Sequence, residues 1–257
     1  MATPKALILR APGTNCDRET AFAFETAGGA AERVHLNRIL DQPNLTEQYQ
    51  ILCLPGGFSY GDDIAAGRIV GSLIRHHLEE TLRQFVDAGK LVLGICNGFQ
   101  ILLKSGILLP DAADGRPPAT LAWNQSQRFV DRWVHLKTTN NNSVFLKDIE
   151  KMYLPVAHAE GRFVARDAAT LQSLDQAGQL ALRYTDADGG EATFPDCPNG
   201  AQLCVAGATD ATGRVFGLMP HPERYLAPTH HPRWTRGEAS EVGDGLKVFQ
   251  NAVQFFA

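Results

Sequence analysis

Short, unbroken apolar segments in the first part of the chain predict the strands of a parallel sheet. They lie at residues 6–9, 51–54 and 91–95, and each runs into a loop rich in Gly, Pro or Asn. A strand covered by helices on both faces is apolar at every position, whereas a strand with one face in water alternates. We therefore expect alternating strands and helices, and an α/β fold with a mostly parallel sheet.

Between these segments, the spacing of apolar residues predicts helices over residues 17–27 and 64–88, the second interrupted near His76. Glycines follow both, as is common after the last turn of a helix. Right-handed crossovers bring the loops that follow parallel strands to one edge of the sheet, where open α/β folds bind ligands. Three loops should meet there, at residues 12–17, 55–63 and 94–98.

The second half of the chain has a different pattern. Apolar and polar residues alternate over residues 129–136, which predicts a strand with one exposed face. Further strands are expected at residues 151–154, 180–184, 202–206 and 214–219, with a turn at 210–213 and a helix within 244–256. We expect a single domain over residues 1–257, decorated by two insertions at about 184–196 and 227–243.

Composition narrows the class of function. The formal net charge of −4 and the lack of a Lys/Arg block argue against a nucleic-acid or anionic-membrane partner. No apolar run reaches the roughly 20 residues of a membrane-spanning helix, and the amino terminus lacks the pattern of a secretion signal. The five cysteines are odd in number and scattered, which suits a reducing compartment. We expect a cytoplasmic protein that acts on a small metabolite.

The strongest chemical signal is Gly94-x-Cys96-x-Gly98, between a predicted buried strand and a helix. This is the pattern of a nucleophile elbow, a tight turn that needs small residues two positions before and after the nucleophile. Free N–H groups at the start of the helix favour a thiolate. On this motif alone, a buried cysteine in an ordinary turn remains the alternative.

The same edge of the sheet offers partners for a cysteine nucleophile. The backbone N–H groups of Gly57 and Asn97 are candidates for an oxyanion hole, although Gly57 also fits a plain Gly-rich turn. His221 and Glu223 follow a predicted strand, and residues two apart in an extended segment point the same way. They are therefore candidates for a base and the group that orients it, unless they are an incidental loop pair.

Other reactive side chains receive simpler interpretations. Cys16 has no elbow around it, so we expect a structural or partner-facing role. Asp62 and Asp63 either contact substrate or cap the following helix, and the cap is the simpler account. The pair His230-His231 is expected to be exposed. No metal site is predicted, because the remaining cysteines lack ligand spacing.

Together these motifs resemble the class I, or triad, glutamine amidotransferases, which implies a flavodoxin-like fold. Four longer segments look like the glutaminase component of phosphoribosylformylglycinamidine synthase, at residues 10–17, 55–62, 158–161 and 219–224. The likeness extends over nearly the whole chain. It implies that the chain hydrolyses L-glutamine and delivers ammonia for the conversion of formylglycinamide ribonucleotide to formylglycinamidine ribonucleotide in purine biosynthesis.

By this resemblance, Cys96 attacks the carboxamide to form a γ-glutamyl thioester, His221 transfers protons and Glu223 orients His221. Phe58 and Gln100 would line the glutamine pocket, although packing explains both equally well. The chain has no Walker-type phosphate loop, so a separate synthetase subunit would use the ATP and Mg²⁺ of the reaction. A small bridging subunit would join the two, and no cofactor is expected in this chain.

Some alternatives stay open. An independent cysteine hydrolase could use the same three residues, but it would not need a partner, whereas a glutaminase subunit should be activated by one. A catalytically silent binding module is a third possibility, against which the intact Cys96, His221 and Glu223 argue. The segment 227–243 would cover the site or meet the partner, or is a surface loop without a role.

Overall fold

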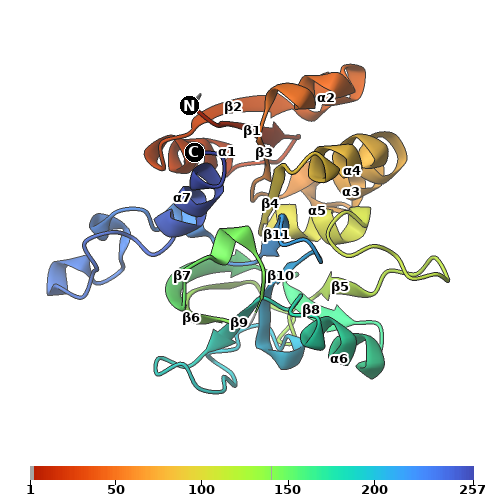
Figure 1. Cartoon of the computed structure of the whole chain (residues 1–257). Coiled ribbons are helices and arrows are strands. Elements are labelled where there is room, and N and C mark those ends of the chain that lie inside the picture. The colour runs from red at the N-terminus through yellow and green to blue at the C-terminus, as the bar shows by residue number, and fades with distance from the viewer. Residues whose placement is uncertain (1–2, 140) are drawn as a thin grey trace.

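The computed structural model describes residues 3–139 and 141–257, and a single large sheet runs through this part of the chain. Its strands are β1 (Lys5–Arg10), β2 (Ala30–His35), β3 (Ile51–Leu54), β4 (Leu91–Ile95), β6 (Val130–Thr138), β7 (Lys151–His158), β9 (Leu182–Thr185), β10 (Val205–Thr209) and β11 (Val215–Leu218). Their order is β2-β1-β3-β4-β11-β10-β9-β6-β7 (Figure 1). Two short strands, β5 (Ala119–Ala122) and β8 (Arg162–Ala165), pair separately as an antiparallel ribbon.

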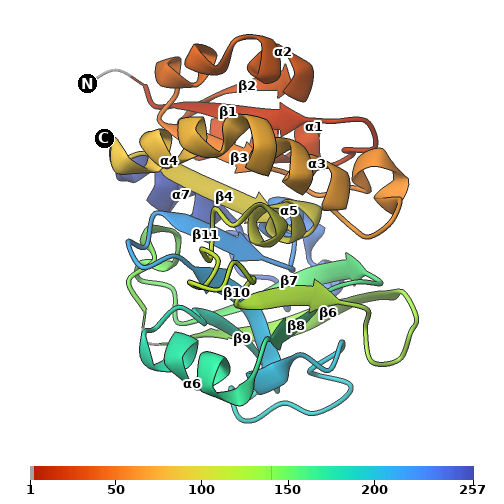
Figure 2. The same cartoon turned by 90° about the vertical axis from the view of Figure 1, so that its right-hand side faces the viewer.

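The half of the sheet from β2 to β11 is parallel. Strands β3 and β4 begin and end where their apolar runs do, and every residue in both is buried. The carboxyl ends of β1 and β4 lie at one edge of the sheet, as Figure 2 shows. The parallel α/β arrangement predicted from the unbroken apolar segments is therefore confirmed.

The other half, from β11 through β10 and β9 to β6 and β7, is antiparallel. The predicted turn at residues 210–213 joins β10 to β11, where the N–H of Gly213 donates to the carbonyl of Asp210 at 3.2 Å. Strand β7 alternates between buried and half-exposed residues, as expected of a sheet with one partly wet face. The central sheet is thus mixed. The three loops predicted to form the site follow strands of its parallel half.

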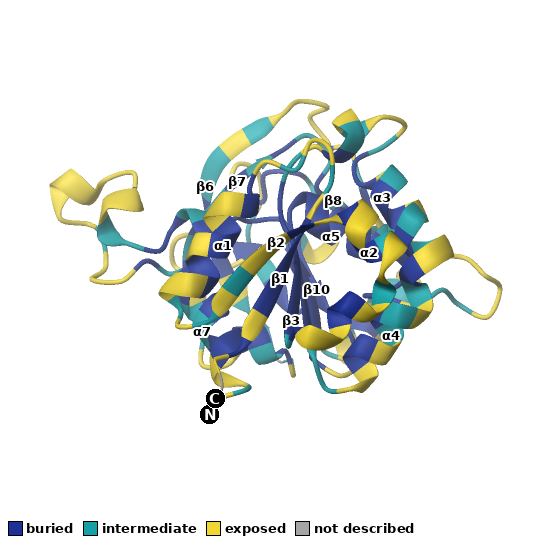
Figure 3. Cartoon of the chain, turned by 90° about the horizontal axis from the view of Figure 1, so that it is seen from above, coloured by how far each residue is buried: buried dark blue, intermediate teal, exposed yellow. Residues whose placement is uncertain are grey.

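Helices cover both faces of the parallel half (Figures 1 and 3). They are α1 (Asp17–Thr26), α2 (Leu36–Asp41), α3 (Arg68–Leu73), α4 (Glu79–Asp87), α5 (Asn97–Ser105) and α7 (Leu246–Gln254), whereas α6 (Ala168–Gln176) contacts β8 at the other end of the molecule. Helices α1 and α7 pack together on one face, where the rings of Phe24 and Phe249 meet edge to face at 5.0 Å. Helices α3, α4 and α5 lie on the other, which completes a three-layer core.

Several elements depart from the pattern-based expectations. The predicted helix over residues 64–88 is divided into α3, a π-type turn at Ile74–Leu78 and α4, and it begins only at Arg68. Strand β2 was missed because it is a charged edge strand, with Glu32 and Arg33 in its middle. The ribbon of β5 and β8 and the helix α6 were also missed, because short segments carry little periodic signal.

Residues 227–243 form an exposed lobe that stands out from the rest of the molecule (Figure 3). The lobe is anchored by His231, which is buried against Trp133, Tyr153 and Tyr225, with ring centroids 5.6 to 5.8 Å away. The expectation that His231 is exposed was wrong, because the aromatic cluster forms only in the folded chain; His230 is exposed as expected. Whether residues 184–196 and 227–243 are insertions in a single domain stays a prediction.

A buried amide holds α7 in place, and this gives a test of the packing. The Nδ2 of Asn251 donates to the carbonyls of Phe145 and Lys147 at 3.0 and 2.7 Å. We expect Asn251→Ala to lower the free energy of unfolding by about 1–3 kcal/mol, because both carbonyls lose their buried donor. Urea unfolding followed by circular dichroism measures the change. The exposed Gln254→Ala on the same helix should change it by less than about 0.5 kcal/mol, and equal losses in both variants would contradict this account.

Candidate active site

The turn between β4 and α5 has the backbone of a nucleophile elbow. Cys96 adopts φ 51° and ψ −104°, a conformation that non-glycine residues rarely adopt. The turn is tight on both sides: a Cβ on Gly98 would lie 1.8 Å from the carbonyl oxygen of Leu54, and one on Gly94 would lie 2.6 Å from Leu102. These contacts give the physical reason for the Gly-x-Cys-x-Gly spacing.

Two backbone amides near Cys96 are the candidates for an oxyanion hole. Asn97 is the first residue of α5, and Gly57 follows β3 at a φ of +150° that suits glycine. Within the described ranges, neither the N–H of Asn97 nor that of Gly57 forms a backbone hydrogen bond. Gly57 and Cys96 line the same cavity. Unpaired N–H groups beside a cysteine can stabilise negative charge on a substrate oxygen.

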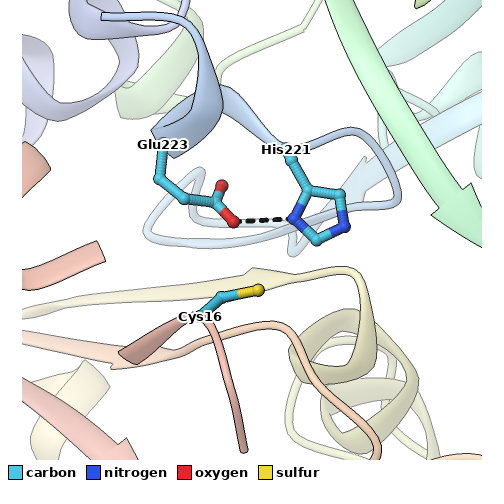
Figure 4. Close-up of side chains that lie close together, drawn as sticks. All are labelled: Cys16, His221 and Glu223. Atoms are coloured by element: carbon cyan, nitrogen blue, oxygen red, sulfur yellow. Dashed lines mark hydrogen bonds and ion pairs between the residues drawn. The ribbon is translucent and has the colours of Figure 1, made fainter. Parts of the chain in front are cut away.

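His221 and Glu223 form a buried pair directly after β11. The Nδ1 of His221 lies 2.7 Å from Oε1 of Glu223, and the two residues are 2% and 3% exposed (Figure 4). The N–H of His221 donates to the carbonyl of Pro155 on β7 at 2.9 Å, so both halves of the sheet hold the histidine. The pair expected from the His-Pro-Glu spacing is therefore present in the fold.

The charge of Glu223 affects the protonation of His221. Burial lowers the pKa of the imidazole, but the negative charge of Glu223 and contacts with the sulfurs of Cys96 and Cys16 outweigh burial. The pKa of His221 is held above its usual value near 6.5 as a result. An imidazole that readily takes a proton can serve as the base for a thiol beside it.

Cys16, at the start of α1, lies beside His221 and Glu223 (Figure 4). Its Sγ is 3.2 Å from Asn15 Oδ1 and 3.2 Å from Nη2 of Arg224, a guanidinium that also pairs with Glu19. Burial and the charge of Glu223 raise the pKa of this thiol, although His221 and Arg224 oppose them. Cys16 is buried, which agrees with the structural role of the two that the sequence left open and not with a partner-facing one.

Cys16, His221 and Glu223 offer a sulfur, a nitrogen and an oxygen within 4.8 Å of one another. Such atoms can ligate a metal ion, and Zn²⁺ accepts all three types. Here, however, the imidazole is bonded to the carboxylate, and the positively charged Arg224 contacts the sulfur. A cation would have to break both contacts, so the arrangement fits a proton-transfer pair better than a metal site.

A cavity of about 120 Å³ opens next to Cys96. Phe58 stands at its rim with 44% exposure, whereas Gln100 is 4% exposed in its wall. The amide of Gln100 accepts a bond from Asn97 Nδ2 at 2.9 Å and donates to the carbonyl of Glu160. Both residues predicted to line a glutamine pocket therefore border this cavity, and their contact with a substrate stays a prediction.

Asp62 also lines the cavity, and it does not cap a helix. Helix α3 begins at Arg68 with Gly67 as its N-cap, so the expected capping role for Asp62 and Asp63 was wrong. Asp62 is half-buried, whereas Asp63 is exposed. The sequence offered no signal to separate these neighbouring aspartates, because the turn at Ser59–Asp62 that aims one of them inward is not periodic.

His158, at the end of β7, is a further buried residue of the site. Its Nδ1 lies 3.0 Å from Asn124 Oδ1, and the Asn124 amide is oriented by donating to the carbonyls of Arg128 and His158 at 2.9 and 2.8 Å. Nδ1 therefore carries the hydrogen. Burial, and then the charge of His221, lower the pKa of His158 to about 3, so it is neutral near pH 7.

Comparison with known proteins places this site in a family. The model of the CobB/CobQ-like glutamine amidotransferase domain matches residues 3–256. The curated phosphoribosylformylglycinamidine synthase subunit PurQ of Dehalococcoides mccartyi is 44% identical over 257 residues, covering 99% of this chain and 98% of the relative. The chain belongs to the PurQ family of glutamine amidotransferases.

Other relatives agree over the full length. PurQ from Pyrococcus furiosus is 35% identical over 254 residues, covering 98% of each chain. A chain in the solved structure of PurLQS from Thermotoga maritima superposes with a TM-score of 0.75 at 32% identity, with 100% of both chains covered. Another glutamine amidotransferase from Thermotoga maritima shares the fold alone, with a TM-score of 0.51 at 15% identity over 92% of this chain and 83% of that one. The amidotransferase resemblance of the sequence is confirmed.

The low pKa of His158 predicts how stability changes with pH. Below pH 6.5 the unfolded chain binds a proton at His158 that the folded chain does not bind. Stability should therefore fall as the pH drops from 6.5 toward 3, by up to about 1.4 kcal/mol per pH unit from this residue. Urea unfolding measures the free energy of unfolding at pH 7 and at pH 5. The decrease between these two pH values should be about 1–2 kcal/mol smaller in His158→Gln than in the wild type.

The exposed His76→Gln is the matched control, and it should keep the pH dependence of the wild type. If His158→Gln and the wild type lose the same free energy between pH 7 and pH 5, His158 is not the buried neutral group described above.

Proposed function

We propose that this PurQ-family chain hydrolyses L-glutamine through a covalent intermediate on Cys96 and passes the ammonia to a synthetase. The observation that carries the proposal is the placement of Cys96. It lies on a strained elbow at the start of a helix, facing a cavity next to two unpaired amides and the His221–Glu223 pair. Each part of this arrangement serves acyl transfer.

In the proposed reaction, the Cys96 thiolate attacks the carboxamide carbon of glutamine. The N–H groups of Gly57 and Asn97 stabilise the negative oxygen of the tetrahedral adduct. His221 gives its proton to the leaving nitrogen, so ammonia departs and a γ-glutamyl thioester remains. His221 then takes a proton from water as the water attacks the thioester, and glutamate leaves as the Cys96 sulfur is freed. Glu223 keeps the imidazole oriented throughout.

Two cysteines lie beside His221, and only Cys96 is suited to this role. Cys96 lines the cavity, whereas Cys16 does not, and Cys16 is 1% exposed. The raised pKa of Cys16 keeps it a thiol near neutral pH. A nucleophile needs access and thiolate character together. We infer that Cys16 supports the far side of His221 as part of the packing.

A synthetase that uses ATP and Mg²⁺, together with a small bridging subunit, is part of the proposal. The names of the relatives support it, because the curated ones are subunits of phosphoribosylformylglycinamidine synthase and the solved one is PurLQS. We propose the same ammonia-dependent conversion of formylglycinamide ribonucleotide to formylglycinamidine ribonucleotide here. In the described part of the chain, no helix is long and apolar enough to cross a membrane. The five free cysteines support a reducing location, the cytoplasm.

Labelling with 6-diazo-5-oxo-L-norleucine, an electrophilic glutamine analogue, tests the nucleophile. We expect a single adduct on Cys96, found by mass spectrometry of peptides, because the cavity brings the reagent to that sulfur alone. Free glutamine should protect Cys96. Cys96→Ala should remain unlabelled, whereas Cys16→Ala, which removes the other thiol beside His221, should still be labelled. An adduct on Cys16 that glutamine does not prevent would overturn the assignment.

A second prediction separates the glutaminase subunit from an independent hydrolase. In the complex with its synthetase, Cys96→Ala should lower glutamine-dependent synthesis by more than about 1,000-fold, because the covalent route is lost. Synthesis from added ammonium salts should stay within about twofold of the wild type. Loss of both activities would point to a damaged interface, and glutamine hydrolysis that no partner accelerates would favour the independent hydrolase.

A further inference from the structure

We infer, independently of the glutaminase function, that a second cleft of the molecule binds a phosphorylated metabolite. The cleft lies where α5 packs against α3 and β5 (Figure 1). It is separate from the cavity at Cys96, because the two have no lining residue in common.

The size and the lining of the cleft suit a small organic anion. Its volume is about 330 Å³, within the range of about 300–1,000 Å³ that is usual for small-molecule sites. Part of its wall is apolar and belongs to α5, β5 and the segment before β5. The polar part consists of four basic side chains and two hydroxyls, those of Arg68, Arg75, His76, Lys104, Ser72 and Thr120.

The charge of this lining is positive. None of the described residues that line the cleft is acidic, although the whole chain has a formal net charge of −4. Arg68, the first residue of α3, is exposed, and over residues 3–139 and 141–257 it forms no ion pair. Cations gathered in a concave site attract anions more strongly than the same cations on a flat surface, because the walls exclude part of the solvent.

Arg75 is paired, but it keeps donors for a ligand. Its Nη1 donates to Oδ2 of Asp111 at 2.5 Å, and its Nη2 donates to Oδ1 of Asp111 at 3.4 Å and to the carbonyl of Lys104 at 3.1 Å. These bonds use at most three of the five N–H groups of the guanidinium. Asp111 itself does not line the cleft. The carboxylate therefore fixes the orientation of Arg75, and the remaining donors can bind phosphate oxygens.

Lys104 is held in a similar way. Its ammonium group, on a side chain that is 11% exposed, lies 3.0 Å from Oε1 of Glu160 and also donates to the carbonyl of Ala66. One of its three N–H groups remains for a ligand. A phosphate group in the cleft would thus meet two cations whose positions are already fixed. Fewer side chains then lose freedom on binding, which favours affinity.

The backbone that carries Arg75 and His76 is also unusual. Both residues lie in the π-type turn Ile74–Leu78, which interrupts the helical segment between α3 and α4. Turns of this kind are rare and occur frequently at functional sites. The catalytic site does not account for this turn, because neither residue lines the cavity at Cys96. The π turn is therefore an independent indication that this face of the molecule has a function of its own.

A phosphate monoester is the anion that fits this cleft best. It carries a charge of about −2 and three acceptor oxygens, which match several cations and hydroxyls at once. A carboxylate offers one charge and two oxygens. The apolar part of the wall would contact the organic part of the ester.

Titration calorimetry of the whole chain tests the site, with ribose 5-phosphate, adenosine 5′-monophosphate and inorganic phosphate as probes. We expect at least one ester to bind at one site per chain, about tenfold or more tightly than inorganic phosphate, because the apolar wall adds contacts. Arg68→Gln should weaken this binding about 10- to 100-fold, because a charge-assisted hydrogen bond is lost. Ser72→Glu, which places a carboxylate in the cleft, should abolish it.

Arg18→Gln is the matched control, because Arg18 is also an exposed arginine but lies on α1 and does not line the cleft. This variant should bind the ester as the wild type does, and thermal melts should show that all three variants are folded. Labelling of Cys96 with 6-diazo-5-oxo-L-norleucine should leave the affinity for the ester unchanged. Failure of that labelling would count against the glutaminase function and not against this cleft.

Four results would overturn the inference. The first is that neither ester binds the wild type, and the second is that inorganic phosphate binds as tightly as both. The third is equal weakening by Arg18→Gln and Arg68→Gln, which would indicate unspecific attraction. The fourth is loss of ester binding once Cys96 is labelled, which would place the ester in the catalytic cavity. If no ester binds and Arg68→Gln weakens assembly with the synthetase, the cleft is a protein interface instead.

Discussion

The close approach of α5 to three neighbouring strands is the constraint on which the rest of the site depends. A Cβ on Gly98 would lie 1.8 Å from the Leu54 carbonyl oxygen of β3, and one on Gly217 of β11 would lie 2.3 Å from the ring of Phe99. Gly94 of β4 is covered as closely. Because the helix lies so near the sheet, its first turn reaches the loop after β3 and the residues after β11 together. Cys96, Gly57 and His221 meet for that reason.

This packing also buries the Glu223 carboxylate, which is 3% exposed. Burying a carboxylate is unfavourable unless other groups compensate, and Glu223 has only His221 on one of its oxygens. Its second oxygen, Oε2, is buried without a hydrogen-bond partner in the part of the chain that the structure describes. An apolar pair in the same place could serve stability at least as well. Stability alone therefore does not explain the pair, which suits the proton transfer that we propose next to Cys96.

How far the sequence predicted this site depended on how local each feature is. The elbow and the apolar strands β3 and β4 could be predicted because their signals lie within a few adjacent residues. The His221–Glu223 pair followed from a two-residue spacing in an extended segment. By contrast, the sequence did not show that Cys16 lies beside His221 or that Asp62 lines the cavity, because these positions depend on contacts with parts of the chain far away in sequence.

The same reasoning explains the errors in the fold. Strand β2 is held by its pairing with β1 rather than by its own pattern, and β5 is held by β8. The burial of His231 likewise requires Trp133 and Tyr153, which come much earlier in the chain, to lie beside it. A single sequence shows which residues can be buried, but not which of the possible partners will cover them.

The position of His221 and Glu223 gives a physical route from a bound partner to the proposed catalytic pair. His221 is bonded to Pro155 of the antiparallel half, while the cysteine belongs to the parallel half, so their alignment requires both halves of the sheet to be in register. The chain then runs from Glu223 through Tyr225, which packs on His231, directly into the exposed lobe. A protein that binds the lobe therefore acts on a segment that begins four residues after Glu223. Binding to residues 227–243 can therefore change how the His221 imidazole is aligned with the Cys96 sulfur, while Cys96 itself stays in place.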